Sequence, residues 1–195
     1  MSARGSLIVL TGPSGVGKDT VLRELFALDP TLAYCVSYTT RAPRPGEVDG
    51  VAYWFVDEAT FRTMIDRDEF FEWSTVYGEL KGRTFESVNR AVESGKDTVI
   101  KIDVQGAEKV RDRLGDGTIY VFLLPPSTEA LEQRLIDRAT EDPASLQARR
   151  QQALSELALK DTYDHQVVND DAARAAHEIL AIIDADRAAR SGRHA

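Results

Sequence analysis

The chain has 195 residues, 43% hydrophobic and 29% charged, which predicts one globular domain with a full core. No apolar run approaches the ~20 residues that span a bilayer, so we expect neither a membrane segment nor a secretory signal. The net charge of −8 argues against nonspecific nucleic-acid binding, and the single Cys35 excludes an internal disulfide framework and favours a reducing, cytoplasmic location.

Apolar strand-like runs alternate along the chain with amphipathic helical stretches. This alternation predicts an α/β fold with a parallel central sheet flanked by helices, and ligands of such sheets bind beyond the carboxyl ends of the strands. The predicted elements in chain order are a strand at 7–10, a helix carrying Val21, Leu22, Leu25 and Phe26, a strand at 98–103, a helix at 106–114, a strand at 119–124, a helix from a Ser127 cap to about Arg138, a strand at 166–168 and a helix opened by Asp170 or Asp171.

Two segments break this alternation. Residues 33–83 carry short strand-like pieces, one short helix after Asp57 and many arginines and aromatics, which predicts an inserted substrate-binding subdomain. Residues 139–146 are polar and interrupt two helices, which predicts the tip of a mobile lid.

The stretch "GPSGVGKDT" follows the first strand and has the G-x-x-x-x-G-K spacing of a phosphate-binding loop. Glycines let backbone N–H groups converge on phosphate oxygens, and the following helix adds its positive N-terminal end. A lysine supplies a positive charge to the β- and γ-phosphates. The alternative is a glycine-rich turn, but the preceding strand and following helix favour the loop. The expected ATP contacts here are Gly12, Pro13, Ser14, Gly15, Val16, Gly17, Lys18, Asp19 and Thr20.

Asp19 stands where this pattern requires a serine or threonine whose hydroxyl holds Mg²⁺. A carboxylate cannot donate to a phosphate, but it can attract Mg²⁺ directly or through water, and it is favourable in the first turn of a helix. Thr20, one residue further on, can still donate toward the α-phosphate. We therefore expect Asp19 near the metal.

The second informative stretch is "SYTTRAPRPGEVDGVAY". Arg41 and Arg44 flank a proline and can clamp one phosphate, Glu47 can orient an arginine, and the Tyr53 hydroxyl can add a donor. The alternative for these residues alone is an exposed basic loop.

With these motifs the chain resembles guanylate kinase over almost its whole length. "GPSGVGKDT" resembles the ATP loop of that family, "VSYTTRAPRPGEVDGVAYWFV" its GMP-binding signature, and "EFFEW", "KIDVQGAEKVR", "VFLLPPSTEALEQRL", "RAT" and "VVND" follow in the family's order. The resemblance implies a single P-loop kinase domain with a core (1–32, 84–126, 161–195), a GMP-binding region (33–83) and a lid region (127–160). It also implies Mg²⁺-dependent transfer of the γ-phosphoryl group of ATP to GMP, and to dGMP.

The resemblance assigns roles to residues at matching positions. Ser37 and Glu72 would read guanine, with the Glu72 carboxylate excluding AMP. The implied ligands of the GMP phosphate are Arg41, Arg44 and Tyr53, supported by Glu47. Asp103 would lie near guanine and the metal, and Asn169 near adenine, while the lid arginines Arg138 and Arg149 would meet the ATP phosphates. The implied catalytic residues are Lys18, Arg41, Arg138 and Arg149.

The chain departs from the family pattern at Asp19 and at three further positions. Lys81 stands where a second phosphate-binding tyrosine is usual, Arg83 where serine or threonine is usual, and Lys101 where an acidic residue is usual. Residues two apart on a strand face the same way, so Lys101 is expected to pair with Asp103.

Two other functions fit parts of the pattern. A kinase for another small phosphate, such as a ribose bisphosphate, shares the loop, and Lys81 and Arg83 would suit extra phosphate charge, but Ser37 and Glu72 favour a base-bearing acceptor. A noncatalytic module that binds protein partners generally loses the phosphate loop, whereas this loop keeps its glycines and Lys18.

Overall fold

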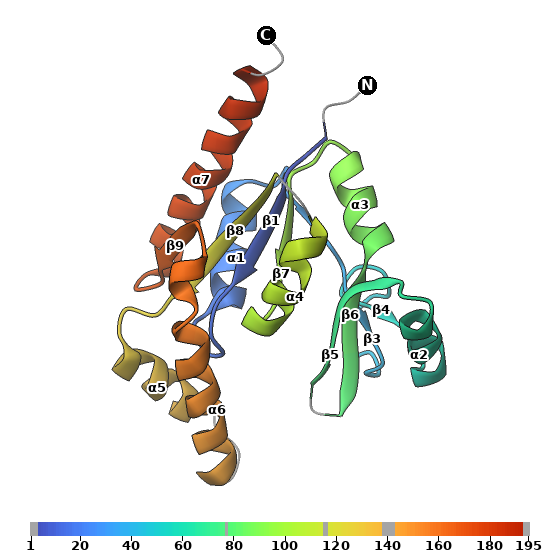
Figure 1. Ribbon diagram of the computed structural model, residues 1–195, viewed down its shortest axis with the longest axis horizontal. Coiled ribbons are helices and arrows are strands. Elements are labelled where there is room, and N and C mark those ends of the chain that lie inside the picture. Colours follow the sequence, from blue (N-terminus) through green and yellow to red (C-terminus); the bar gives the residue numbers. More distant parts are fainter. Residues whose placement is uncertain (1–3, 77, 115–116, 138–142, 193–195) are drawn as a thin grey trace. The chain divides into compact units, whose positions relative to one another are not determined.

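The computed structural model describes residues 4–76, 78–114, 117–137 and 143–192 (Figure 1). The chain forms two compact units: unit 1 comprises Met1–Leu7, Ala33–Ile100 and Gln105–Gly117, and unit 2 comprises Ile8–Leu32, Lys101–Val104 and Thr118–Ala195. The strands are β1 (Leu7–Thr11), β2 (Ala33–Tyr34), β3 (Tyr38–Thr39), β4 (Trp54–Phe55), β5 (Phe70–Val76), β6 (Glu79–Thr84), β7 (Thr98–Lys101), β8 (Thr118–Leu124) and β9 (His165–Val168). The helices are α1 (Lys18–Leu28), α2 (Glu58–Asp66), α3 (Phe85–Glu93), α4 (Val104–Leu114), α5 (Thr128–Asp137), α6 (Pro143–Leu157), the short 3₁₀ turn Lys160–Thr162 and α7 (Ala172–Gly192).

The strands form two sheets. The larger has the order β2-β7-β1-β8-β9, and its β2–β7 and β8–β9 pairs are parallel, which confirms the predicted α/β fold on a parallel sheet. The smaller has the order β4-β3-β6-β5. Among the described helices, none is both long and apolar enough to cross a membrane.

Unit 2 carries the predicted strand–loop–helix start. All five residues of β1 are buried, as expected of a strand covered on both faces. The α1 helix buries Val21, Leu22 and Leu25, and it packs against α7, which buries Ile179 and Ile183. The predicted apolar stripe of α1 is therefore confirmed, except that Phe26 is only partly buried.

Helix caps in unit 2 follow the predicted pattern. Ser127 accepts the backbone N–H of Ala130 at 3.1 Å and so caps α5. Asp171, not Asp170, caps α7, because its carboxylate accepts the backbone N–H of Arg174 at 2.8 Å.

Unit 1 contains the smaller sheet and a core of its own. The hairpin β5–β6 is antiparallel, and α2 covers an aromatic cluster in which the Phe61 and Phe70 rings stack with centroids 4.3 Å apart. The short helix predicted after Asp57 is α2, and Asp57 caps it by accepting the Thr60 N–H at 2.6 Å.

The strand predicted at 98–103 is shorter than expected, and the helix after it is longer. β7 ends at Lys101, and α4 begins at Val104, immediately after Asp103. A carboxylate is favourable at a helix N-terminus, which allows the helix to start two residues before the predicted Gly106. Asp103 therefore lies at the turn between strand and helix, on the exposed side.

Candidate active site

The phosphate loop in unit 2 requires its glycines for space as well as for conformation. Gly12 has φ 139°, and a Cβ there would lie 2.4 Å from the carbonyl oxygen of Leu123 on β8. Gly17 has φ 101°, and a Cβ there would lie 2.4 Å from Nδ2 of Asn169. An L-residue at either position would force the loop away from the elements that hold it.

Lys18 is folded back over this loop. Its Nζ donates to the carbonyls of Gly12 at 2.5 Å and Pro13 at 3.1 Å, so the ammonium lies inside the curve of the backbone. Burial lowers the pKa of Lys18 from 10.5 to about 8. Nearby charges act in both directions. The Lys101 ammonium also lowers the pKa of Lys18, whereas three carboxylates raise it, those of Glu156, Asp103 and Asp19.

A buried carboxylate of α6 also contacts the loop. Glu156 is 4% exposed and accepts the backbone N–H of Ser14 through Oε2 at 3.2 Å, while Gln152 donates to its Oε1 at 2.9 Å. The resemblance assigns no role to Glu156. Since Arg149 lies seven residues earlier on α6, about two helical turns away, both residues project from one side of that helix.

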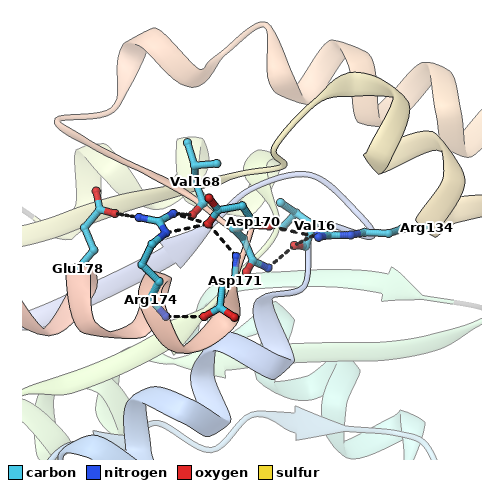
Figure 2. Close-up of polar contacts among 8 residues, drawn as sticks. Val16, Arg134, Val168, Asp170, Asp171, Arg174 and Glu178 are labelled. Atoms are coloured by element: carbon cyan, nitrogen blue, oxygen red, sulfur yellow. Dashed lines mark hydrogen bonds and ion pairs between the residues drawn. The ribbon is translucent and has the colours of Figure 1, made fainter.

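The Val16 carbonyl of the loop is held by two donors (Figure 2). Asn169 Nδ2 donates to it at 2.7 Å and Arg134 Nη1 at 3.0 Å, while Arg134 Nη2 also reaches the Asn169 carbonyl at 3.2 Å. Beyond Asn169, Arg174 braces the turn into α7 through an ion pair with Asp170 at 2.7 Å. Asn169 was predicted near adenine, and here it fixes the loop to the end of β9.

Asp19, in the first turn of α1, forms an ion pair with Lys101. The sequence predicts Asp103 as the partner of Lys101, but β7 ends at Lys101, so the two residues do not lie on one extended strand. Within the described ranges, no cluster of three or more histidine, cysteine or acidic side chains is arranged to hold a metal ion.

Glu47 organises the arginine segment of unit 1, for which a phosphate clamp was predicted. Glu47 accepts from Arg41 Nη2 at 2.7 Å and from the backbone N–H of Arg44 at 2.7 Å. These two contacts, Arg41 first, hold the pKa of Glu47 below its ordinary value. Arg41 and Lys81 both approach the Tyr53 ring, with their cationic groups 5.4 and 5.6 Å from its centroid. The structure therefore brings together three cations or donors from separate elements.

Glu72 and Arg83 form a buried ion pair in the β5–β6 hairpin. Glu72 Oε1 lies 2.7 Å from Arg83 Nη1, and the two side chains are 11% and 5% exposed. Arg83 also donates to the Cys35 carbonyl and to the Tyr34 hydroxyl, both at 3.3 Å. The carboxylate predicted to read guanine is thus fixed by a residue that stands where the family usually has serine or threonine.

Some of the remaining predicted residues are described by the structure and others are not. Ser37 is buried just before β3, and its carbonyl accepts the N–H of Trp54 at 2.9 Å. Thr20 lies in α1 and Arg149 in α6. Arg138 and the part of the predicted lid tip at 139–142 lie outside the described residues, and residues 143–146 begin α6.

Three functional candidates were not found from the sequence. Arg134 had a signal, because it is a second arginine within the predicted helix after Ser127. The Glu72–Arg83 pair follows from the hairpin register, because counting outward from the Val76–Glu79 pair places these two residues opposite each other. Glu156 had none, because its contact depends on how α6 packs on the loop.

Known proteins resemble this chain throughout. The family model described as Guanylate kinase matches residues 4–186. The curated guanylate kinase of Symbiobacterium thermophilum is 45% identical over 95% of this chain and 87% of its own length, and that of Halalkalibacterium halodurans is 42% identical over 96% and 91%. The crystal structure of guanylate kinase from Anaplasma phagocytophilum superimposes with a TM-score of 0.73 at 31% identity, covering 95% of this chain and 87% of that one.

A family model that spans nearly the whole chain and relatives above 40% identity agree with the resemblance carried by the phosphate loop and by the segments around Arg41 and Glu72. The chain therefore belongs to the guanylate kinase family.

Proposed function

We propose that this chain transfers the γ-phosphoryl group of ATP to GMP, giving ADP and GDP in purine nucleotide metabolism and GMP recycling. The observation that carries the proposal is the pairing of an intact phosphate loop, with Lys18 folded onto it, and a buried base-reading carboxylate, Glu72, on the sheet that also carries the Lys81 end of the phosphate clamp. We extend the acceptor to dGMP, and we place the reaction in the cytoplasm.

The donor half binds ATP through unit 2. The loop N–H groups and the N-terminus of α1 receive the β- and γ-phosphates, and Lys18 exchanges its two backbone carbonyls for phosphate oxygens. Asn169 and Arg134 keep the loop in shape through the Val16 carbonyl, next to the proposed adenine position. Arg138 and Arg149 are proposed to meet the phosphates from the lid, which we assign to residues 127–160.

The acceptor half binds GMP through unit 1, for which we propose the region 33–83. Arg41, Arg44 and Tyr53 hold the phosphate, and Glu47 keeps Arg41 in place. Glu72 accepts from the guanine N1–H and amino group, with Ser37 beside it. The ion pair with Arg83 holds Glu72 in place, and a carboxylate at this position rejects adenine, which presents an acceptor at N1.

Mg²⁺ is the proposed cofactor, and the residues present fit it in a limited way. Mg²⁺ prefers oxygen ligands and keeps several waters, so nucleotide phosphates supply most of its coordination. Asp19, whose side chain is 75% exposed, and Asp103 offer carboxylate oxygens at the edge of the loop. When bound, the ion neutralises charge on the β- and γ-phosphates.

The function is tested by measuring ADP release with a panel of acceptors. Purified chain is assayed with ATP and Mg²⁺ against GMP, dGMP, AMP and a ribose bisphosphate, and each product is identified by chromatography. We expect GDP and dGDP to form at rates well above the ATP hydrolysis seen without an acceptor. Turnover with the sugar phosphate but not GMP would favour the first rival function, and no turnover with any acceptor would favour a binding module.

ATP binding to the free enzyme is expected to weaken as pH rises through about 8, the pKa that burial gives Lys18. Below this pH the ammonium is charged and attracts the phosphates, and above it the charge is lost. Bound phosphates favour the charged form, so kcat/KM for ATP should fall with a pKa near 8 while kcat falls at higher pH. The measurement is a pH profile of both constants.

Glu156 provides the matched test of that profile. Its carboxylate raises the pKa of Lys18, so Glu156→Gln should move the fall in kcat/KM to lower pH while an amide oxygen still accepts from Ser14. Glu178→Gln removes an equal charge from an exposed pair with Arg174 and should leave the profile in place. An unshifted profile in Glu156→Gln would show that Lys18 does not set it.

Lys81 is expected to bind the GMP phosphate in place of the missing tyrosine. Lys81→Met should raise KM for GMP about tenfold, the size of a lost charge-assisted hydrogen bond, and should flatten its dependence on salt. Lys81→Tyr should recover part of the affinity, because tyrosine is a rigid neutral donor. Lys96→Met is the control for loss of an exposed lysine in the same unit. If Lys81→Met changes neither KM nor its salt slope, the Tyr53–Arg41 pair suffices.

A further inference from the structure

Two departures from the family pattern meet in space. Asp19 replaces the serine or glycine usual in the family, Lys101 replaces an acidic residue, and the two side chains form an ion pair across 82 positions of sequence. Relative to the pattern, the acidic group has moved from the end of β7 to the start of α1, and a cation has taken its former place. The two departures are therefore in direct contact in the structure.

This pair lies at the phosphate loop. Asp19 directly follows Lys18, and the N–H of Ile102, next to Lys101, donates to the Leu10 carbonyl at 3.2 Å. Leu10 lies two residues before Gly12, where the loop begins. Lys101 is also close enough to act on Lys18 as a like charge. The ammonium groups of Lys18 and Lys101 therefore lie in the same small region beside the phosphate loop.

The chemistry of the pair suits a phosphate better than a metal. A carboxylate next to the loop would repel a polyphosphate, and Lys101 offsets that charge. An ammonium has three donors, and Asp19 takes one of them, which leaves two for other oxygens. The Lys101 side chain is 29% exposed, so those donors are accessible from solvent.

We propose that Lys101 is a second lysine ligand of the nucleotide phosphates, and that Asp19 positions it instead of coordinating Mg²⁺ directly. The identification of the ligand as a nucleotide rests on the proposed function. The consequence is that the site keeps part of its affinity for ADP when Mg²⁺ is absent, because a fixed cation takes over part of the charge neutralisation that Mg²⁺ supplies.

The test is calorimetric binding of ADP with Mg²⁺ and, separately, with EDTA. Lys101→Met should weaken binding in EDTA by about tenfold or more, as expected for a lost charge-assisted hydrogen bond. Lys101→Arg should retain most of the affinity. Lys160→Met, which breaks an exposed lysine–aspartate pair elsewhere in unit 2, is the control and should bind as the wild type does.

A double variant separates binding from mere compensation. If Lys101 only neutralises Asp19, then Asp19→Asn combined with Lys101→Met should return ADP affinity in EDTA to the wild-type value, which would overturn the proposal. If Lys101 is a ligand, the double variant stays weak.

The metal role of Asp19 is tested by the ratio of the two affinities. We expect Asp19→Asn to change the gain from Mg²⁺ by less than about threefold, whereas loss of that gain by about tenfold would assign the ion to Asp19 and contradict the inference. Wild-type protein that binds no ADP in either buffer would refute the proposed function itself. An ADP-binding wild type with an unaffected Lys101→Met refutes only this inference.

Discussion

Lys18→Ala should lower kcat by a factor on the order of 10³ or more, because it removes the cation that we propose to contact the β- and γ-phosphates. The structure supplies the reason: the ammonium is held inside the loop by the Gly12 and Pro13 carbonyls, so its charge is already placed before ATP arrives. Steady-state rates with saturating ATP and GMP measure the effect. The fold should survive, since the loss also removes a half-buried charge that burial disfavours.

The control for this result is Lys160→Ala, which removes an exposed lysine of the same unit. Its kcat should match the wild type, and circular dichroism and Tm should be alike for all three proteins. A folded Lys18→Ala enzyme with near wild-type kcat would remove the phosphate loop from the mechanism.

Glu72→Gln should reduce both stability and GMP turnover. The Arg83 guanidinium stays charged and buried, so losing the carboxylate costs about 3 kcal/mol of unfolding free energy, the lower end for breaking a buried pair because the amide oxygen still accepts. That corresponds to a fall in Tm of roughly 6–12 °C for a chain of this size. Losing a carboxylate that accepts from two donors of guanine should lower kcat/KM for GMP about tenfold or more.

Combining Glu72→Gln with Arg83→Met separates the two effects. The double variant removes the unpaired charge, so most of the lost Tm should return, while kcat/KM for GMP should stay low. Recovery of GMP turnover together with stability would show that Glu72 supports the hairpin and does not read the base.

The sequence predicts those parts of the molecule whose signals are local. The strand, the loop and α1 follow from a single run of residues. Ser127 caps α5 as predicted, and a short helix follows Asp57 as predicted, because the start of a helix depends on immediate neighbours. The clamp of Arg41 and Glu47 is also local, since six positions separate the two residues.

Contacts between distant elements were beyond such signals. The ion pair of Lys101 with Asp19 was not predicted, because it joins residues 82 positions apart. The contact of Glu156 with Ser14 joins residues 142 positions apart, and only the packing of α6 brings them together. Element ends and helix packing, rather than residue chemistry, were the missing information.

The ratio of kcat/KM for GMP to that for AMP, measured by ADP release with the purified wild-type chain, tests the central claim most directly. The claim is that a phosphate loop serves an acceptor chosen by the Glu72 carboxylate. A site built to accept from guanine donors should reject AMP, so the ratio should be at least about 10³. A ratio near one, or a preference for AMP, would contradict the claim.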